Sequence, residues 1–337
     1  MPTKRQEEIL KLIVLEYIKL AKPVGSTLIC DTLRCSSATV RAEMANLEEL
    51  GLLEKTHTSS GRVPSEAGYR YYVDNLMILK EISGEDMLKL QTIFSNNQLE
   101  VSDCLKKSLE IISDMTNYTS VILGETSHEN MLKEINIVPL SNTSLIVIVI
   151  TDKGVVEHKT INISGLSIAE IKKTVTLINN MIIGTPIDEV SVKLEFEIKP
   201  IIANYVREHE RLYNVFYDVF TSFTTKNVDV MGRKNILKLP EFNNVSKISE
   251  ILEKFEDDNL VEIVDTDEEN NISIYIGKEN NLNEDMTVIK TKYKTNKEEG
   301  TIAIIGPKRM EYDRVVNMLE YIKANLDKVA NEGDSDE

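Results

Sequence analysis

The sequence predicts an α+β multidomain protein in which a winged helix-turn-helix precedes an α/β domain, itself interrupted by a mainly helical segment. Three observations lead to this fold class. The chain has 337 residues, more than one ordinary hydrophobic core accommodates. Its first 75 residues show three helical patterns followed by a short hairpin pattern. Further along, strand-forming stretches stand on both sides of a long helical stretch, as in a domain that another domain interrupts.

The first two helices are predicted from apolar spacing and from their ends. Residues 3–22 place apolar side chains at helical spacing, and Thr3 is a suitable N-cap. A proline and a glycine break this pattern before a second helix over residues 27–33. A short polar connection then leads to a third helix over residues 37–50, which buries one apolar stripe and ends at a C-cap glycine, Gly51.

The third helix carries the first candidate DNA-binding residues. Its face opposite the apolar stripe, near the N-terminus, holds small and hydroxyl side chains and one arginine. A recognition helix places its N-terminal residues against base edges in the major groove. Small residues let the backbone approach closely, and Arg41 can pair with a guanine or a phosphate. For this helix taken alone, a solvated face would be the favoured interpretation. The candidates are Ser37, Ala38, Thr39 and Arg41.

A hairpin pattern follows directly and predicts the wing. Residues 52–56 form a short strand, a turn with Gly61 follows, and Pro64 cuts off the return strand. Hydroxyls and an arginine on such a turn can contact phosphates or a minor groove without strong positive charge. A fourth helix is predicted over residues 66–79, capped by Ser65; for its arginine, a phosphate contact and a plain surface position are equal alternatives. The candidates in this stretch are His57, Thr58, Ser59, Ser60, Arg62 and Arg70.

Charge is distributed unevenly along the chain. The first 75 residues hold ten Lys/Arg and ten Asp/Glu, whereas the whole chain has a formal net charge of −16. An acidic body repels a polyanion over long distances. If the protein binds nucleic acid, its first 75 residues must therefore do so, and by reading bases more than by bulk charge. The composition, with 42% hydrophobic residues and no apolar run long enough to span a membrane, predicts a cytoplasmic globular protein.

The remaining chain changes between helical and strand patterns. Residues 81–127 look helical, and residues 134–163 contain three strands, whose central run Leu145–Ile150 should be buried on both faces. Residues 167–227 look helical and concentrate aromatic side chains, which suggest a core or a subunit interface. Because these aromatic residues lie outside both predicted domain cores, we assign them to a dimer surface. Strands, a final helix and an acidic tail follow. The dimer-surface residues are Tyr213, Phe216, Tyr217 and Phe220.

Three segments carry a family resemblance. The N-terminal signature of HrcA, the heat-inducible transcription repressors of bacterial chaperone operons, is similar to "SSATVRAEMANLEELGLLEKTHTSSGRVPSEAGYRYYVD". C-terminal motifs of that family resemble "IGKEN" (Ile276–Asn280) and "IGPKRMEYDRVV" (Ile305–Val316). The chain departs from the family pattern at Ala42, where an asparagine is usual, and at Gly232, where two glycines are usual.

The resemblance implies a domain organisation. It consists of a winged helix-turn-helix, a GAF-like α/β domain and a mainly helical inserted dimerisation domain that interrupts the GAF-like domain. The expected boundaries are 1–78 for the winged helix, 79–165 and 229–328 for the two parts of the GAF-like domain, 166–228 for the insertion and 329–337 for an acidic disordered tail.

The resemblance also implies a function. A homodimer would bind double-stranded DNA at an inverted-repeat operator, repress the class I heat-shock genes of the GroE and DnaK operons, and be released on heat stress, with activity dependent on the GroE chaperonin. The alternative is a small-molecule-sensing winged-helix regulator that uses the GAF-like domain as a ligand pocket. We predict no enzyme activity, cofactor or metal site: cysteines and histidines are scattered, and "IGPKRM" lacks the spacing of a phosphate-binding loop.

Overall fold

The computed structural model combines helices and sheets, as the sequence predicted, in two compact units. Unit 1 consists of Met1–Ile122, Asp229–Lys292 and Thr301–Val329, and unit 2 of Leu123–Val228, Tyr293–Gly300 and Ala330–Glu337. The described residues are 1–56, 61–79, 82–96, 101–126, 130–154, 156–163, 167–201, 213–214, 216–217, 220, 227–242, 245–255, 257–265, 271–294 and 298–332.

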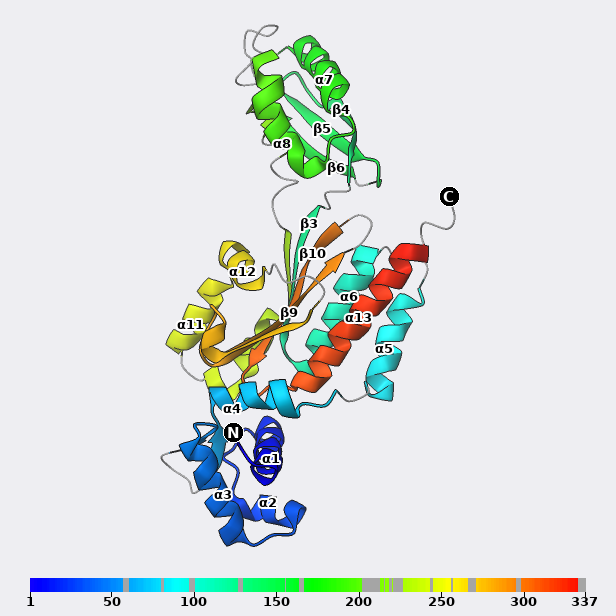
Figure 1. The fold of residues 1–337 in the computed structure, drawn as a ribbon. Helices are drawn as coiled ribbons and strands as arrows, with labels where there is room; N and C mark the ends of the chain where they lie inside the picture. Colours follow the sequence, from blue (N-terminus) through cyan, green and yellow to red (C-terminus); the bar gives the residue numbers. More distant parts are fainter. Residues whose placement is uncertain are drawn as a thin grey trace. The chain divides into compact units, whose positions relative to one another are not determined.

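Unit 1 begins with three helices and a hairpin (Figure 1). The helices are α1 (Lys4–Leu20), α2 (Ser26–Leu33) and α3 (Ser37–Glu49), and the hairpin pairs β1 (Leu53–Lys55) with β2 (Arg62–Pro64) in antiparallel fashion. The predicted ends are confirmed, because Thr3 forms a capping box at the start of α1 and Gly51 adopts a positive φ of 74° after α3. The side chains at the centre of this small core are Ile9, Leu10, Ile13, Val14, Val40, Met44 and Leu47.

The fourth helix is shorter than predicted. It comprises α4 (Glu66–Tyr71), which Ser65 caps, and a π-helical turn, η1 (Tyr72–Leu76). Gly68 lets the backbone of α4 pack directly on the hairpin, since a Cβ atom there would lie 2.0 Å from the carbonyl oxygen of Leu52. The backbone of α4 therefore contacts the backbone of the chain at Leu52, directly before β1.

A five-stranded sheet with the order β7-β3-β10-β9-β8 forms the centre of the remaining fold. Figure 1 shows α5, α6 and α13 on one side of this sheet and α11 and α12 on the other. The strands are β3 (Thr119–Thr126), β7 (Asn227–Met231), β8 (Ser273–Ile276), β9 (Met286–Lys294) and β10 (Glu298–Pro307). The helices are α5 (Gly84–Phe94), α6 (Val101–Thr116), α11 (Val245–Lys254), α12 (Asp257–Val264) and α13 (Tyr312–Glu332).

Strand β3 corrects the prediction of helix over residues 81–127. Helices α5 and α6 lie in that range, but Thr119–Thr126 form a strand between β7 and β10. Consecutive residues from Thr119 to Leu123 are buried, as expected of a central strand covered on both faces. Such a run has no periodicity of two that would distinguish it from the end of a buried helix.

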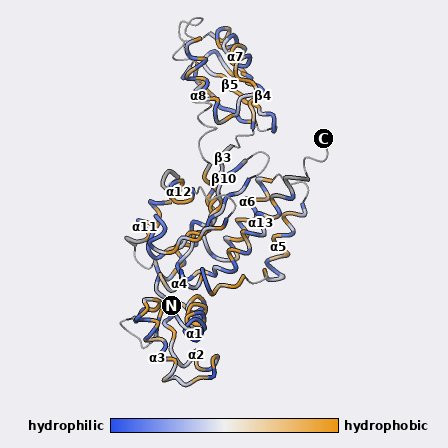
Figure 2. The backbone as a smooth tube through the Cα atoms, in the orientation of Figure 1, coloured by the Kyte–Doolittle hydropathy of each residue, from blue (hydrophilic) through white to orange (hydrophobic). Residues whose placement is uncertain are grey.

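Unit 2 contains a separate three-stranded antiparallel sheet. Its order is β4 (Leu132–Pro139), β5 (Ser144–Thr151) and β6 (Val156–Asn162). Its helical segments are α7 (Ile168–Ile182), η2 (Ile187–Glu189), α8 (Val190–Lys193) and η3 (Leu194–Ile198), which confirms the helical interpretation of this stretch. In Figure 2 the strand β5 is hydrophobic along its length, whereas helices such as α7 and α13 alternate between hydrophobic and hydrophilic residues.

The three strands lie in a different unit from the one predicted. We expected residues 79–165 to belong to the first α/β domain and the insertion to begin at residue 166, but strands β4 to β6 share the hydrophobic core of α7 in unit 2, which begins at Leu123. Unit 2 therefore contains a sheet as well as helices. At the other end, α13 extends to Glu332, beyond the predicted start of the tail at 329.

The aromatic residues assigned to a dimer surface lie in the core of unit 2. Phe216 and Phe220 are fully buried, Tyr213 is 5% exposed, and Tyr217 packs against the same cluster. Their neighbours in that core include Leu145 and other residues of β5 and α7. The dimer-surface prediction is wrong for this cluster, because these side chains cover the sheet of their own unit.

Candidate nucleic-acid interface

The N-terminal part of α3 presents an exposed face of small residues and one arginine. Because Val40, Met44 and Leu47 turn into the core, the residues between them point outward. Ser36 holds the start of the helix, since its Oγ accepts a hydrogen bond from the Thr39 N–H at 3.1 Å. The predicted residues are thus brought together: Ala38, Arg41 and Ala42 are exposed, and Ser37 and Thr39 are half-buried.

A row of hydroxyl contacts orients Arg41. Its Nε donates to Ser26 Oγ at 3.2 Å, and Ser26 Oγ lies 2.9 Å from Ser37 Oγ. These contacts join the starts of α2 and α3, so the guanidinium is held at the end of α3 that a recognition helix turns to DNA. Sequence reasoning missed this positioning role of Ser26, which only the packing of the two helices reveals.

The hairpin arginine, predicted as a phosphate or minor-groove contact, has partners within the chain. Arg62 forms an ion pair with Glu48 of α3, with Nη2 and Oε2 2.7 Å apart, and its side chain is 15% exposed. Its backbone also pairs with Val24, at N···O distances of 2.8 and 2.9 Å. This geometry fixes the base of the wing against α3 and favours a structural role over a phosphate contact. The predicted wing-tip residues His57, Thr58, Ser59 and Ser60 lie outside the described residues.

Arg70, for which a phosphate contact and a plain surface position were equal alternatives, contacts other residues of unit 1. The exposed fraction of its side chain is 30%, and its Nε donates to Glu279 Oε1 at 3.0 Å. Its Nη1 lies 3.3 Å from Asp74 Oδ1, and its Nη2 donates to the carbonyl oxygen of Ile274. The guanidinium is thus engaged within unit 1, on the helix that faces the five-stranded sheet.

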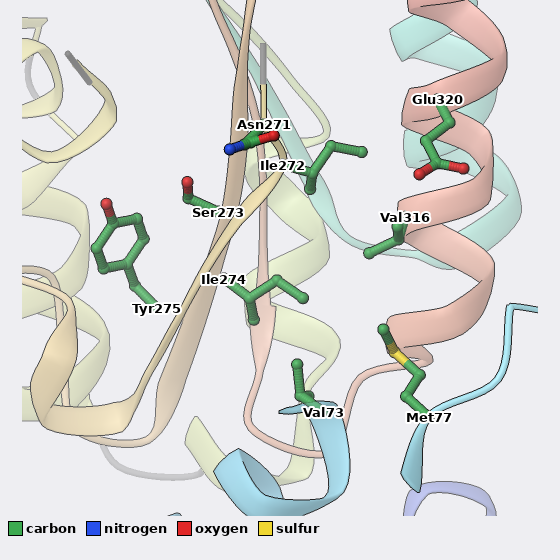
Figure 3. Close-up of a pocket in the computed structure, with 9 residues that line it drawn as sticks. All are labelled: Val73, Met77, Asn271, Ile272, Ser273, Ile274, Tyr275, Val316 and Glu320. Atoms are coloured by element: carbon green, nitrogen blue, oxygen red, sulfur yellow. The ribbon is translucent and has the colours of Figure 1, made fainter. Parts of the chain in front are cut away.

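A groove of about 570 Å³ lies where η1, β8 and α13 meet (Figure 3). Val73 on η1 and Met77 just after it project toward Ile274 on β8 and Val316 on α13, and Glu320 lies further along α13 (Figure 3). The lining mixes aliphatic side chains with the polar groups of Asn271, Ser273, Tyr275 and Glu320. Because its charged member is a carboxylate, the groove would suit a neutral or cationic ligand better than a phosphorylated one. It is the feature that a ligand-sensing regulator would use.

Metal and membrane sites receive no support from the described part of the chain. Within the residues that the structure describes, no three His, Cys, Asp or Glu side chains come together as metal ligands would. In the same residues, no helix has both the length and the apolar character needed to cross a bilayer.

A helix-turn-helix with an exposed second helix, followed at once by a β-hairpin, defines a winged-helix DNA-binding protein; here it is joined to a larger helix-and-sheet region. A family model described as the HrcA protein C terminal domain matches residues 102–316, which lie beyond the winged helix. The chain belongs to the HrcA family.

Relatives match almost the whole chain. The "Heat-inducible transcription repressor HrcA" of Bacillus pumilus is 38% identical over 97% of both chains. The protein of the same name from Halalkalibacterium halodurans is 37% identical over 98% of both chains. A crystal structure of a protein called hypothetical, 25% identical, covers 98% of this chain and 99% of its own with a TM-score of 0.66, so the fold is shared over its full length.

Proposed function

We propose that this chain is a DNA-binding transcriptional repressor of class I heat-shock genes, the GroE and DnaK operons, and that heat stress releases it from its operator. The observation that carries the proposal is the exposed N-terminal face of α3 within a winged helix. The names of the full-length relatives, heat-inducible transcription repressors, supply the regulated response.

Sequence reading is assigned to the start of α3. Ala38 and Ala42 let the helix backbone approach the floor of the major groove, while Ser37 and Thr39 can bond to base edges or phosphates. Arg41 can make a bidentate contact to guanine. Because the whole chain has a net charge of −16, affinity depends on these specific contacts more than on long-range attraction.

An inverted-repeat operator calls for a two-fold symmetric protein, and we assign the dimer interface to the open face of the three-stranded sheet. On β5, Leu145, Val147 and Val149 are fully buried by their own unit. The residues of the other face, Ile146, Ile148 and Ile150, are only half-buried. Flanking them in register are Val138 on β4, 44% exposed, and Val156 on β6, 56% exposed.

A second copy of the same sheet is the best cover for this face. A continuous apolar strand is typical of a strand buried on both sides, and among the described residues of unit 2 the helices cover one side of β5. Isologous packing would place one isoleucine row against its symmetry mate. On this proposal, unit 2 is the inserted dimerisation domain, and the five-stranded sheet with its helices is the GAF-like domain.

Dependence on the GroE chaperonin is supported by the topology of that sheet. Strand β3 lies beside β10, so residues near 120 must meet residues near 305 before the sheet can close. Such long-range pairing is slow and leaves apolar strands exposed during folding, which makes the chain a suitable chaperonin client.

A footprint on the organism's own chaperone promoters tests the proposal. We expect two protected arms related by a dyad, with protection strengthened by chaperonin and lost after a heat step. Arg41→Ala, which leaves the buried core untouched, serves as the matched loss-of-reading variant. Absence of protection by folded wild-type protein on every chaperone promoter would overturn the assigned function.

The groove of Figure 3 supports one second candidate, the ligand-sensing regulator. A purified protein that carries a small molecule through gel filtration, and loses it when Ile274 is changed to Asp, would favour this alternative.

A further inference from the structure

The two C-terminal motifs, "IGKEN" and "IGPKRMEYDRVV", contribute nothing to the DNA-reading face of α3. Both instead contact the winged helix within unit 1. Strand β8 and the turn η6 (Gly277–Glu279) contain the first motif, and the end of β10 leads into the second. Each motif supplies one charged residue and one close-packed residue to that contact.

The first contact joins α4 to η6. Arg70 donates from Nε and Nη2 to the two carboxylate oxygens of Glu279. Glu279 is itself oriented by the Ile276 N–H, which donates to Oε2 at 2.9 Å. Such a two-pronged arginine–carboxylate pair restricts direction as well as distance. The contact therefore fixes the rotation of α4 relative to β8.

Glu66 makes a complementary contact at the same turn. Its Oε2 accepts a hydrogen bond from the Lys278 N–H at 3.1 Å. Gly277 has a φ of 57°, and a Cβ atom there would lie 2.1 Å from Glu66 Oε2. The left-handed backbone therefore favours a glycine at this position, and the absence of a side chain leaves room for the carboxylate of Glu66.

The second contact joins α1 and α4 to the other motif. Arg309 pairs with Glu241, at 3.3 Å between Nη2 and Oε2, and its Nη1 lies 3.5 Å from the carbonyl oxygen of Ile18 at the end of α1. Between the two charged contacts, the rings of Tyr69 and Tyr312 pack with centroids 6.1 Å apart. Burial raises the pKa of both phenols, so they remain neutral there.

We propose that these contacts form a joint that positions the winged helix for operator binding, and that Arg70 and Glu279 are positioning residues of this joint. The proposal rests on the proposed DNA-binding function. Interfaces between domains of one chain allow relative motion by default, so a fixed recognition helix needs such restraints. A dimer can engage both arms of an inverted repeat only if its two recognition helices keep a set separation.

Four variants and three kinds of DNA test the joint: the operator, a single operator arm, and an operator whose arms are moved apart. Operator affinity is measured for wild type, Arg70→Gln, Glu279→Gln and the double variant, together with a duplex that carries one operator arm. Arg314→Gln is the matched control. The side chain of Arg314 is 33% exposed, against 30% for Arg70, and its Nη2 lies 2.8 Å from Asp86 Oδ2. This ion pair lies outside the winged helix.

We expect each single variant at the joint to weaken binding to the whole operator by roughly tenfold, with the double variant no weaker than either single one. Affinity for the single arm and the slope of affinity against salt should not change. The variants should also tolerate an operator whose arms are moved apart, whereas wild type and Arg314→Gln should not.

Two results would overturn the joint. If Glu279→Gln left binding intact while Arg70→Gln weakened binding to all DNA and lowered the salt slope by about one, Arg70 would be a phosphate contact. If both joint variants matched Arg314→Gln on every DNA, the contacts would serve stability only. Failure of wild type to bind any operator would instead count against the proposed function, which keeps the two failures distinct.

Discussion

The exposed face of α3 and the open face of the three-stranded sheet differ in chemistry. The first offers Ala38, Arg41 and Ala42 to solvent, with hydroxyls beside them. The second offers the half-buried row Ile146, Ile148 and Ile150. Small residues and a cation suit base edges and phosphates, whereas an aliphatic row on a sheet gains most from a second apolar surface. Within one chain, the chemistry of an uncovered face thus indicates the class of its partner.

The largest effect we expect concerns the face of the unit 2 sheet that packs into the hydrophobic core. Phe216→Ala should destabilise unit 2 by about 3–5 kcal/mol, because it opens a cavity beneath β5 at a fully buried side chain. Phe196→Ala in η3 is the control, since that ring is 73% exposed and should cost little. Urea unfolding measures both. Equal, small decreases in the free energy of unfolding for both variants would mean that the aromatic cluster lies at the surface of unit 2.

The contrast between these regions also explains what the sequence could predict. The winged helix was predictable because its signals are local. Thr3 and Ser65 cap helices and Gly51 ends one, and each lies within a few residues of the apolar pattern that it delimits. The short strands of the hairpin were predicted for the same reason. The open face of α3 followed from the apolar period of a single helix.

Unit 2 and the joint depended on distant partners, which periodicity does not reveal. Phe216 was predicted to lie at a surface because strand β5, which shares its hydrophobic core, lies about seventy residues earlier in the chain. Arg70 looked available to DNA because its carboxylate partner, Glu279, lies 209 positions further along. The signal that could have pointed to the partner was the quoted "IGKEN" motif, which the DNA-reading role did not use.

The next effect in size concerns the open face. Ile148→Asp should raise the dimer dissociation constant by at least about thirtyfold, since one charge per subunit would be buried in an apolar interface. The fold should persist, because Ile148 lies outside the hydrophobic core cluster of unit 2. Sedimentation measures the dimer, and Lys159→Asp, exposed and in register with Val147, is the control. An unchanged dimer would place the interface elsewhere.

A smaller effect is expected on the α3 face. Arg41→Ala should weaken specific operator binding by about 1–3 kcal/mol, roughly 5- to 150-fold, with little change in binding to random DNA. The thermal midpoint should stay the same, because the side chain is exposed. Titrations at matched salt measure both affinities. Lys89→Ala, which changes an exposed side chain on α5, is the control. A uniform loss on all DNA would make Arg41 a phosphate contact.

The smallest effect is a pH dependence at the joint. Partial burial alone would raise the pKa of Glu279, but the hydrogen bonds from Arg70 and the Ile276 N–H outweigh it and hold that pKa below the ordinary 4.5. A carboxyl whose pKa is lowered by folding stabilises the folded state above its unfolded pKa and loses that contribution as the pH falls through the folded value. Because Glu279 is 37% exposed, we expect less than about 1 kcal/mol. Urea unfolding of wild type and Glu279→Gln should therefore differ by a constant amount at neutral pH, and the difference should shrink as the pH falls below the ordinary pKa of 4.5 and through the lower folded-state value. A difference that instead grew as the pH fell would mean that Glu279 is more stable protonated, and would remove the ion pair with Arg70 from the joint.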